Sequence, residues 1–218
     1  KPNEFDNAIT ANAPSHNVIL IDGNGAPPKG LLNKWGGADA FIENTVDGDD
    51  LSYAESRQSY EDTDIIRGVA FVRERYFVMA DRLTSDQTEP REYRYRLHAF
   101  AGYDLDGEVS LEPYGPRIQR ELGSIDVFTT STAGDCTLEE PPYAPLEAPH
   151  VHSLDNGGAD HTVTDSVITG NAPDFLTILA PYQTGTESGE DGPITVTPIE
   201  TTEGAAWLIE TDAYTDVA

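Results

Sequence analysis

The sequence contains a single cysteine, Cys136, among 218 residues. One thiol excludes an internal disulfide framework and any zinc site built on several cysteines. No His and Asn pattern accompanies it, so we interpret Cys136 as a small hydrophobic residue or an inert thiol rather than a nucleophile. The sequence also lacks a Gly-x-Ser-x-Gly motif, a phosphate-binding loop and a dinucleotide-binding fingerprint.

Positive charge is scarce. Lys and Arg total 13 against 39 Asp and Glu, which gives a formal net charge of −26. All basic residues lie between Lys1 and Arg120, and the rest of the chain carries 18 acidic residues. Such a field repels phosphate backbones and anionic lipids, so no nucleic-acid partner and no membrane partner are expected. Few lysines and many acids suit either a halophilic protein or an ordinary acidic secreted one, and both remain open.

Long hydrophobic runs are also missing. Apolar stretches such as residues 18–21 and 175–180 are far too short to span a bilayer. The first residues contain no initiator Met, basic region or signal-like apolar run, and we interpret the chain as a piece of a longer protein. Acidic turns such as Asp47–Asp50 lack the spacing of a calcium-binding loop and are interpreted as solvated turns.

What the sequence does contain is a series of short β-rich runs separated by Gly, Pro, Asn and Asp. This pattern predicts an all-β fold, an antiparallel β-sandwich, as one domain over residues 1–218. Residues 38–46 are the one candidate for a short helix, and residues 139–161 are predicted to be a long Pro- and Gly-rich loop. The strands are expected within residues 16–23, 65–73, 76–83, 92–102, 108–115, 117–123, 124–131, 161–170, 174–183, 193–200 and 205–213.

Two of these runs, residues 65–73 and 76–83, are joined by the polar sequence Arg-Glu-Arg and predict a hairpin. We expect this hairpin to lie centrally in the fold. Its predicted core residues are Ile65 or Ile66, Val69, Phe71, Phe77 and Met79.

Four segments, taken in order, resemble the heparinase II/III-like polysaccharide lyases. The sequence SHNVILIDGNG, from Ser15, is similar to the His-Asn strand of that family, and SYED followed by RGVAFVRERYFVMADRL is similar to its hairpin. YRYRLHAF, from Tyr93, resembles the strand that ends in Leu-His, and FLTILAPY, from Phe175, resembles a late strand of the same region. The four matching segments lie within residues 15–182.

The resemblance implies a β-sandwich region that follows an (α/α) toroid in the complete enzyme. It also implies cleavage of uronate-containing polysaccharides by β-elimination, in which a Tyr or His base removes the C5 proton. In the family the base lies in the toroid, and a further site Tyr lies shortly before the His-Asn strand, where residues 1–15 contain no Tyr. No catalytic residue is therefore assigned in this chain, which is expected to be inactive alone.

The resemblance also implies one metal ligand. Some family members hold a structural zinc through two upstream residues and the His of the His-Asn strand, which corresponds to His16. A histidine that only hydrogen-bonds a neighbouring loop is the alternative, and both remain open. A second cluster, His150, His152 and His161, lies in the predicted loop and is interpreted mainly as mobile chain rather than a metal site.

The strand at residues 93–99 alternates apolar residues with Arg94, Arg96 and His98 on one face. These three residues are the candidate substrate-binding residues, because arginines pair bidentately with carboxylates such as those of uronates. Internal ion pairing with the many acidic residues of the chain is the alternative for this strip.

Two functions of different classes follow. The first is the β-sandwich portion of a secreted polysaccharide lyase, located extracellularly or in the periplasm, with an acidic polysaccharide and the upstream toroid as partners. The second is a non-catalytic glycan-binding or structural module, part of an extracellular matrix or filament, with the same fold. An upstream toroid with Tyr, His and Asn in its cleft favours the first.

Overall fold

The computed structural model describes residue 13 and residues 16–27, 40–99, 101–102, 105–141, 162–186, 192–199, 201 and 204–218. These residues form β-strands and no α-helix, which confirms the predicted all-β fold. The strands are β1 (Ile19–Ile21), β2 (Phe41–Asp47), β3 (Leu51–Tyr60), β4 (Thr63–Val72), β5 (Tyr76–Ser85), β6 (Arg91–Ala99), β7 (Glu108–Glu112), β8 (Gly115–Gln119), β9 (Gly123–Ser131), β10 (Thr137–Glu139), β11 (Thr162–Gly170), β12 (Phe175–Gln183), β13 (Thr195–Ile199), β14 (Ala206–Glu210) and β15 (Thr215–Val217).

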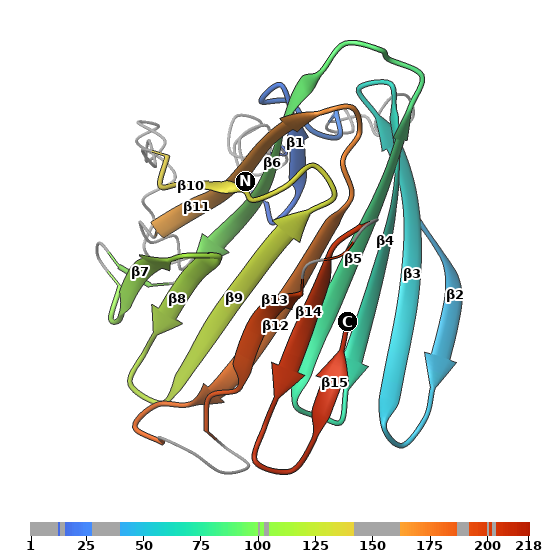
Figure 1. The fold of residues 1–218 in the computed structure, drawn as a ribbon. Helices are drawn as coiled ribbons and strands as arrows, with labels where there is room; N and C mark the ends of the chain where they lie inside the picture. Colours follow the sequence, from blue (N-terminus) through green and yellow to red (C-terminus); the bar gives the residue numbers. More distant parts are fainter. Residues whose placement is uncertain are drawn as a thin grey trace, which may run out of the picture.

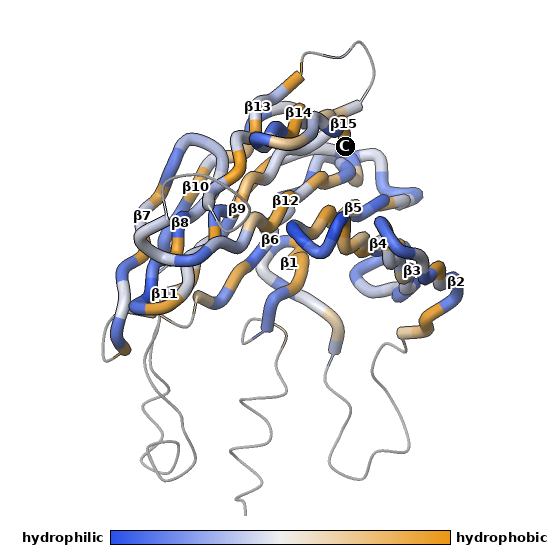
Figure 2. Tube along the Cα trace, turned by 90° about the horizontal axis from the view of Figure 1, so that it is seen from below, coloured by the Kyte–Doolittle hydropathy of each residue, from blue (hydrophilic) through white to orange (hydrophobic). Residues whose placement is uncertain are grey.

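The strands form three antiparallel sheets stacked in layers (Figures 1 and 2). The large sheet has eight strands in the order β2-β3-β4-β5-β12-β9-β8-β7. The small sheet, β1-β6-β11-β10, packs on one face of it, and the C-terminal sheet, β13-β14-β15, packs on the other. The predicted sandwich is therefore present, with a third layer that the sequence did not indicate.

The predicted hairpin is confirmed as β4 and β5 near the centre of the large sheet, with Val72 paired with Tyr76. Of the two candidate core residues, Ile65 is buried and Ile66 is half-buried. The other four predicted core residues are only half-buried. The small sheet has half as many strands as the large one, so within the described residues it covers only part of the hairpin face.

The first core lies between the small and large sheets and includes polar groups. Its apolar residues are Ile19, Ile21, Tyr60, Ile65, Leu83, Tyr93, Tyr95 and Phe175. Beside them Arg67 forms a bidentate ion pair with Asp81, with Nε–Oδ1 at 2.6 Å and Nη2–Oδ2 at 3.1 Å. The Asp81 side chain is completely buried. The Tyr60 hydroxyl donates to the Ile19 carbonyl oxygen at 2.6 Å, which ties β3 to β1.

The second core lies between the large sheet and the C-terminal sheet and is almost wholly apolar. Its centre is Trp207, fully buried, with the Tyr114 ring edge-on at a centroid distance of 5.3 Å. The remaining members are Tyr76, Ile178, Ala180, Ile194, Val196 and Ile209. Strand β12 serves both cores because its side chains alternate between the two faces: Phe175 enters the first and Ile178 the second.

Two local predictions need correction. The helix predicted for residues 38–46 is wrong where the structure describes it, because residues 41–47 form β2, an exposed edge strand paired with β3. Phe, Ile, Thr and Val dominate this run and favour a strand. The loop was predicted to start at residue 139, but Glu139 is the last residue of β10, so the loop starts at residue 140. Residues 142–161 lie outside the described part of the chain. No described helix is long and apolar enough to cross a membrane.

Candidate functional site

The structure brings the two sets of predicted site residues to one corner of the small sheet. His16 precedes β1, and β1 pairs antiparallel with β6, which carries the arginine strip. The His98 amide donates to the Asn17 side-chain oxygen at 2.7 Å, and the Arg96 amide donates to the Val18 carbonyl at 2.9 Å. A segment about eighty residues earlier in the sequence therefore closes the edge of the strand that the resemblance highlighted.

Arg94 and Arg96 project from the same face of β6, as the alternation predicts, and both meet carboxylates of the chain itself. Arg96 pairs with Asp165 through two bonds, Nε–Oδ1 at 2.8 Å and Nη2–Oδ2 at 2.7 Å. Arg94 contacts Glu92 at 2.6 Å, Glu139 at 2.7 Å and Asp165 at 3.4 Å. The register explains this row, because Arg96 lies opposite Asp165 and Asp165 lies opposite Glu139.

The positive charge of Arg94 and Arg96 is therefore balanced by carboxylates of the chain itself. Two guanidinium groups, with side chains 21% and 15% exposed, face three carboxylates, of which Asp165 is fully buried. The hydrogen bonds that Arg94 donates to Glu92, together with those to Glu139, raise the pKa of Arg94 against the opposing effect of burial. A uronate carboxylate at this strip must compete with Glu92 or Glu139, whose side chains are 39% and 43% exposed. The geometry therefore supports the internal ion pairing that the sequence left open as the alternative.

The acidic partners of the strip were missed at the sequence level. Asp165 lies in the run TVTDSV, the first six residues of β11, and all six are buried. An acidic residue in a strand buried on both faces requires a cationic partner, because an unpaired buried charge is very costly. That signal predicts a buried ion pair, and only the strand register identifies Arg96 as its partner.

No group of three or more His, Cys, Asp or Glu side chains in the described residues is arranged to hold a metal ion. His16 is exposed, and its amide donates to the Ala13 carbonyl at 3.0 Å. His150, His152 and His161 lie outside the described residues. Within this chain, a zinc site at His16 would have only that one ligand, because the resemblance places the other two upstream.

Three buried tyrosines of the described residues, Tyr60, Tyr76 and Tyr95, are poor proton acceptors. Burial raises the pKa of Tyr95 to about 12, and burial likewise raises the pKa values of Tyr60 and Tyr76. A tyrosine that abstracts a proton needs a stabilised phenolate, which requires a lowered pKa. These three hydroxyls instead stay protonated. Burial also raises the pKa of Cys136 to about 12, which agrees with its interpretation as an inert thiol.

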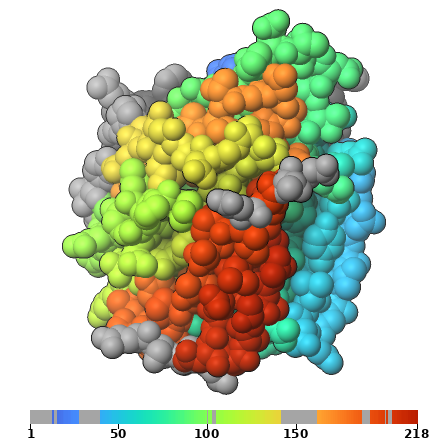
Figure 3. Space-filling model, in the orientation of Figure 1, coloured from blue at the N-terminus to red at the C-terminus, as the bar shows by residue number. Residues whose placement is uncertain are grey.

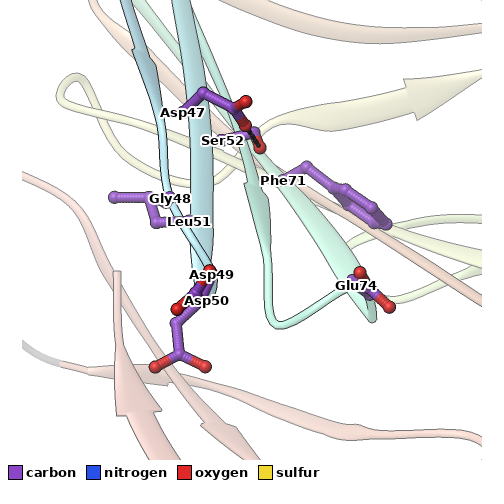
Figure 4. A pocket seen from close by; sticks show the side chains of 8 residues that line it. All are labelled: Asp47, Gly48, Asp49, Asp50, Leu51, Ser52, Phe71 and Glu74. Carbon is purple, nitrogen blue, oxygen red and sulfur yellow. Dashed lines mark hydrogen bonds between the residues drawn. The ribbon is translucent and has the colours of Figure 1, made fainter.

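Two surface hollows lie at opposite ends of the β3–β4–β5 strands, and acids line both. The first, of about 630 Å³, is formed by the β2–β3 and β4–β5 turns (Figure 4). Figure 4 shows its acids on two separate turns, Asp49 and Asp50 on one and Glu74 on the other. The second, of about 680 Å³, includes Glu61, Asp62, Asp64 and Asp86 among its lining residues. Carboxylates in both hollows repel a polyanion, so neither suits an acidic glycan.

Comparison with solved structures finds the same fold in heparinase structures. The described chain is similar to a heparinase III gene product with methylated lysines, with a TM-score of 0.66 and 11% identity, over 95% of this chain and 30% of that one. It is similar to a further heparinase III at 0.64 and 14% identity, over 95% and 29%. The heparan sulfate lyase HepC from Pedobacter heparinus gives 0.62 and 14% identity, over 93% and 30%.

No protein-family model and no curated protein sequence matches this chain. At such low identity the likeness shows the fold alone, and the chain spans about 30% of the length of the heparinase structures that it matches. The β-sandwich fold implied by the resemblance of the four segments is therefore present.

The resembling segments have a shared structural role. They supply every apolar residue of the first core except Ile65, and they also supply both members of the Arg67–Asp81 ion pair. The resemblance was detectable because these residues specify how the small sheet packs on the large one. The resemblance therefore reports on the architecture of the sandwich.

Proposed function

We propose that this chain is the β-sandwich portion of a secreted polysaccharide lyase that cleaves uronate-containing acidic glycans by β-elimination. The proposal rests on the share of each chain that aligns with the other. Heparinase III structures align with 95% of this chain, whereas the chain accounts for only about 30% of theirs. A whole sandwich that corresponds to a minor part of an enzyme is expected of a supporting domain.

In this proposal the reaction is divided between two parts of a longer protein. The toroid implied by the resemblance supplies the Tyr or His base, and the sandwich supports it and closes one side of the glycan cleft. The raised pKa values of Tyr60, Tyr76 and Tyr95 support this division, since these three buried hydroxyls stay protonated near neutral pH. Arg94, Arg96 and His98 would contribute to substrate binding only by exchanging Glu92 or Glu139 for a uronate carboxylate.

A structural zinc is part of the proposal only as a property of the longer protein. His16 would supply one neutral imidazole ligand at the corner beside β6, and two upstream residues would complete the site. Metal content measured on the longer protein and its His16→Ala variant tests this. We expect one zinc per wild-type chain and a large loss in the variant, and wild-type protein without zinc would contradict the assignment.

The acidic surface is proposed to reflect an extracellular or periplasmic location, with a high-salt habitat as the sharper version. At a net charge of −26, added salt screens the self-repulsion of the folded chain. Melting temperature is therefore expected to rise between low and molar sodium chloride. A flat or falling melting temperature would contradict the high-salt version.

A non-catalytic glycan-binding or structural module is the second candidate. One specific observation favours a structural role: Arg94 and Arg96 pair with carboxylates of the chain itself and so hold neighbouring strands together. Unsaturated uronates distinguish the two candidates, because only the lyase releases them. The longer protein is incubated with alginate, heparan sulfate, ulvan and polygalacturonate, and ultraviolet absorbance of unsaturated uronates is followed. Release of that product supports the lyase, whereas glycan binding without product supports the module.

A further inference from the structure

The outer face of β2 and β3 lies beside the C-terminal sheet and is open in the described structure. Tyr53 pairs with Ala70, and Ala70 pairs with Val78, which packs against the second core. Cross-strand partners share a face, so Tyr53 lies on the same side of the large sheet as the C-terminal sheet. Figure 3 shows that sheet in red, with β2 and β3 in blue beside it.

We call this surface the β2–β3 outer face, and cross-strand register defines it. Phe41 is opposite Arg57, Asn44 is opposite Glu55, and Val46 is opposite Tyr53. Gly68 on β4 and Arg82 on β5 extend it toward the centre of the large sheet. Phe41 and Val46 are 61% and 56% exposed, which is unusual for apolar residues on a regular strand.

The Tyr53 ring lies over Gly68 in the space that a side chain would otherwise fill. A Cβ atom at Gly68 would lie 2.7 Å from the Tyr53 hydroxyl oxygen, 3.0 Å from Cε2 and 3.2 Å from Cζ. The glycine therefore lets the ring lie against the backbone of the sheet. Tyr53 is half-buried, so part of its side chain remains exposed on this face and offers an aromatic surface for stacking.

Polar groups on neighbouring strands hold this ring in place. The Tyr53 hydroxyl donates to Glu55 Oε2 at 2.9 Å, and the Asn44 amide donates to Glu55 Oε1 at 2.8 Å. Arg82 Nη2 contacts the same carboxylate at 3.1 Å. The hydrogen bonds from Asn44 and Tyr53 lower the pKa of Glu55, so it stays an ionised acceptor at neutral pH. Four strands thus contribute to one fixed arrangement.

The arginines of the β2–β3 outer face are more exposed than those of the β6 strip. Arg57 and Arg82 have side chains 51% and 62% exposed, against 21% and 15% for Arg94 and Arg96. Arg57 has a loose contact with Glu43 at 3.5 Å. Two exposed guanidinium groups against two carboxylates make this face neutral in a chain of net charge −26.

We propose that the β2–β3 outer face binds a strand of acidic polysaccharide, with one pyranose ring stacked on Tyr53 and the anionic groups of the polymer on Arg82 and Arg57. Tyr53 and Arg57 are four residues apart on β3, about 13 Å, which spans a few linked sugars. The class of polymer rests on the proposed function, whereas the geometry of the platform does not. The site is distinct from the corner formed by His16 and β6.

The test is direct binding to the 218-residue chain, with uronate oligosaccharides cut from alginate, heparan sulfate, ulvan and polygalacturonate and with uncharged cellohexaose. Amide chemical shifts locate each probe, and calorimetry gives its affinity. Tyr53→Ala should weaken binding about five- to tenfold. Gly68→Ala should weaken it similarly, because the new methyl group lifts a ring that is otherwise intact. Tyr53→Phe, which keeps the ring, should change affinity less than about twofold.

Charge is tested with a matched pair. Arg82→Ala should weaken binding about threefold, whereas Arg120→Ala removes the same charge from an exposed residue between β8 and β9 and should leave affinity unchanged. Circular dichroism confirms that each variant folds.

Three results would overturn the proposal: no shifts on β2–β3 with any uronate probe, equal binding of cellohexaose, or unchanged affinity in folded Tyr53→Ala and Gly68→Ala. None of these depends on whether the longer protein is a lyase, because binding is measured on this chain alone.

Discussion

The two cores on opposite faces of the large sheet are built from different interactions. The first core joins the small sheet through directional contacts, namely the Arg67–Asp81 pair and the hydrogen bond from Tyr60 to the Ile19 carbonyl. The second core joins the C-terminal sheet through aromatic and aliphatic packing around Trp207. Directional contacts require one register, whereas apolar packing tolerates many shapes of similar volume. The first core therefore specifies the sandwich, and the second mainly adds stability to it.

The largest expected effect is in the second core. Trp207→Ala should reduce the free energy of unfolding by about 5 kcal/mol, since it leaves a large cavity and removes the indole donor 3.4 Å from the Leu176 carbonyl. Urea unfolding followed by circular dichroism measures the loss. A loss below about 1 kcal/mol would show that the C-terminal sheet is not held by this residue.

Breaking the buried ion pair should cost slightly less. Asp81→Ala leaves the Arg67 charge without its partner, and we expect a loss of about 3–4 kcal/mol, moderated because Arg67 is 17% exposed. Replacing both residues, as Arg67→Met with Asp81→Leu, should restore most of the stability.

Cys136 offers a reporter for this core, because it packs against its edge and burial raises its pKa to about 12. Alkylation of the native chain should be slow and should accelerate in Asp81→Ala. If Trp207→Ala accelerates alkylation of Cys136 equally, the two cores open together, which would contradict their separate roles.

A smaller effect is expected for Tyr60→Phe. The variant removes the hydroxyl that donates to the Ile19 carbonyl at 2.6 Å and should cost about 1 kcal/mol. Tyr76→Phe is the matched control beside the second core, where the hydroxyl donates to Asp216 at 2.8 Å. We expect amide hydrogen exchange in β1 to become faster in Tyr60→Phe and to stay as in wild type in Tyr76→Phe. Unchanged exchange of β1 in Tyr60→Phe would contradict the role of this hydrogen bond in holding β1 to β3.

The smallest effect is a dependence on pH at the end of β1. The hydrogen bond from Arg91, followed by that from the Glu92 amide, lowers the pKa of Asp22 below its usual 3.8. A lowered folded-state pKa contributes stability above pH 3.8 that is lost as the pH falls through the folded value. Wild type should therefore melt slightly above Asp22→Asn at pH 7, and the difference should vanish in strong acid. A constant difference at every pH would contradict this.

Sequence patterns predicted much of the fold because alternation and turn residues carry it directly. The β4–β5 hairpin, β6 and β12 follow from strand-like runs, and the four resembling segments implied the β-sandwich. Strand β2 was misread because an exposed edge strand lacks the buried alternation that marks a strand.

The candidate site was less predictable than the fold. Arg94 and Arg96 were correctly placed on one face, but their compensation depends on Glu139 and Asp165, which only the sheet order brings next to them. The platform of Tyr53 on Gly68 was likewise not visible, because the two residues are brought together by the pairing of β3 with β4. Contacts across strands arise from tertiary structure, and periodicity within a strand does not encode them.

The proposed function has one central expectation, namely that this chain supports, but does not itself perform, the elimination of uronate glycans. The direct test measures unsaturated uronate released per minute by the longer protein and by residues 1–218, side by side, on the same panel of acidic polysaccharides. We expect steady release by the longer protein on at least one polymer and none by the 218-residue chain. Release by the 218-residue chain alone, or none by the longer protein on every polymer, would contradict it.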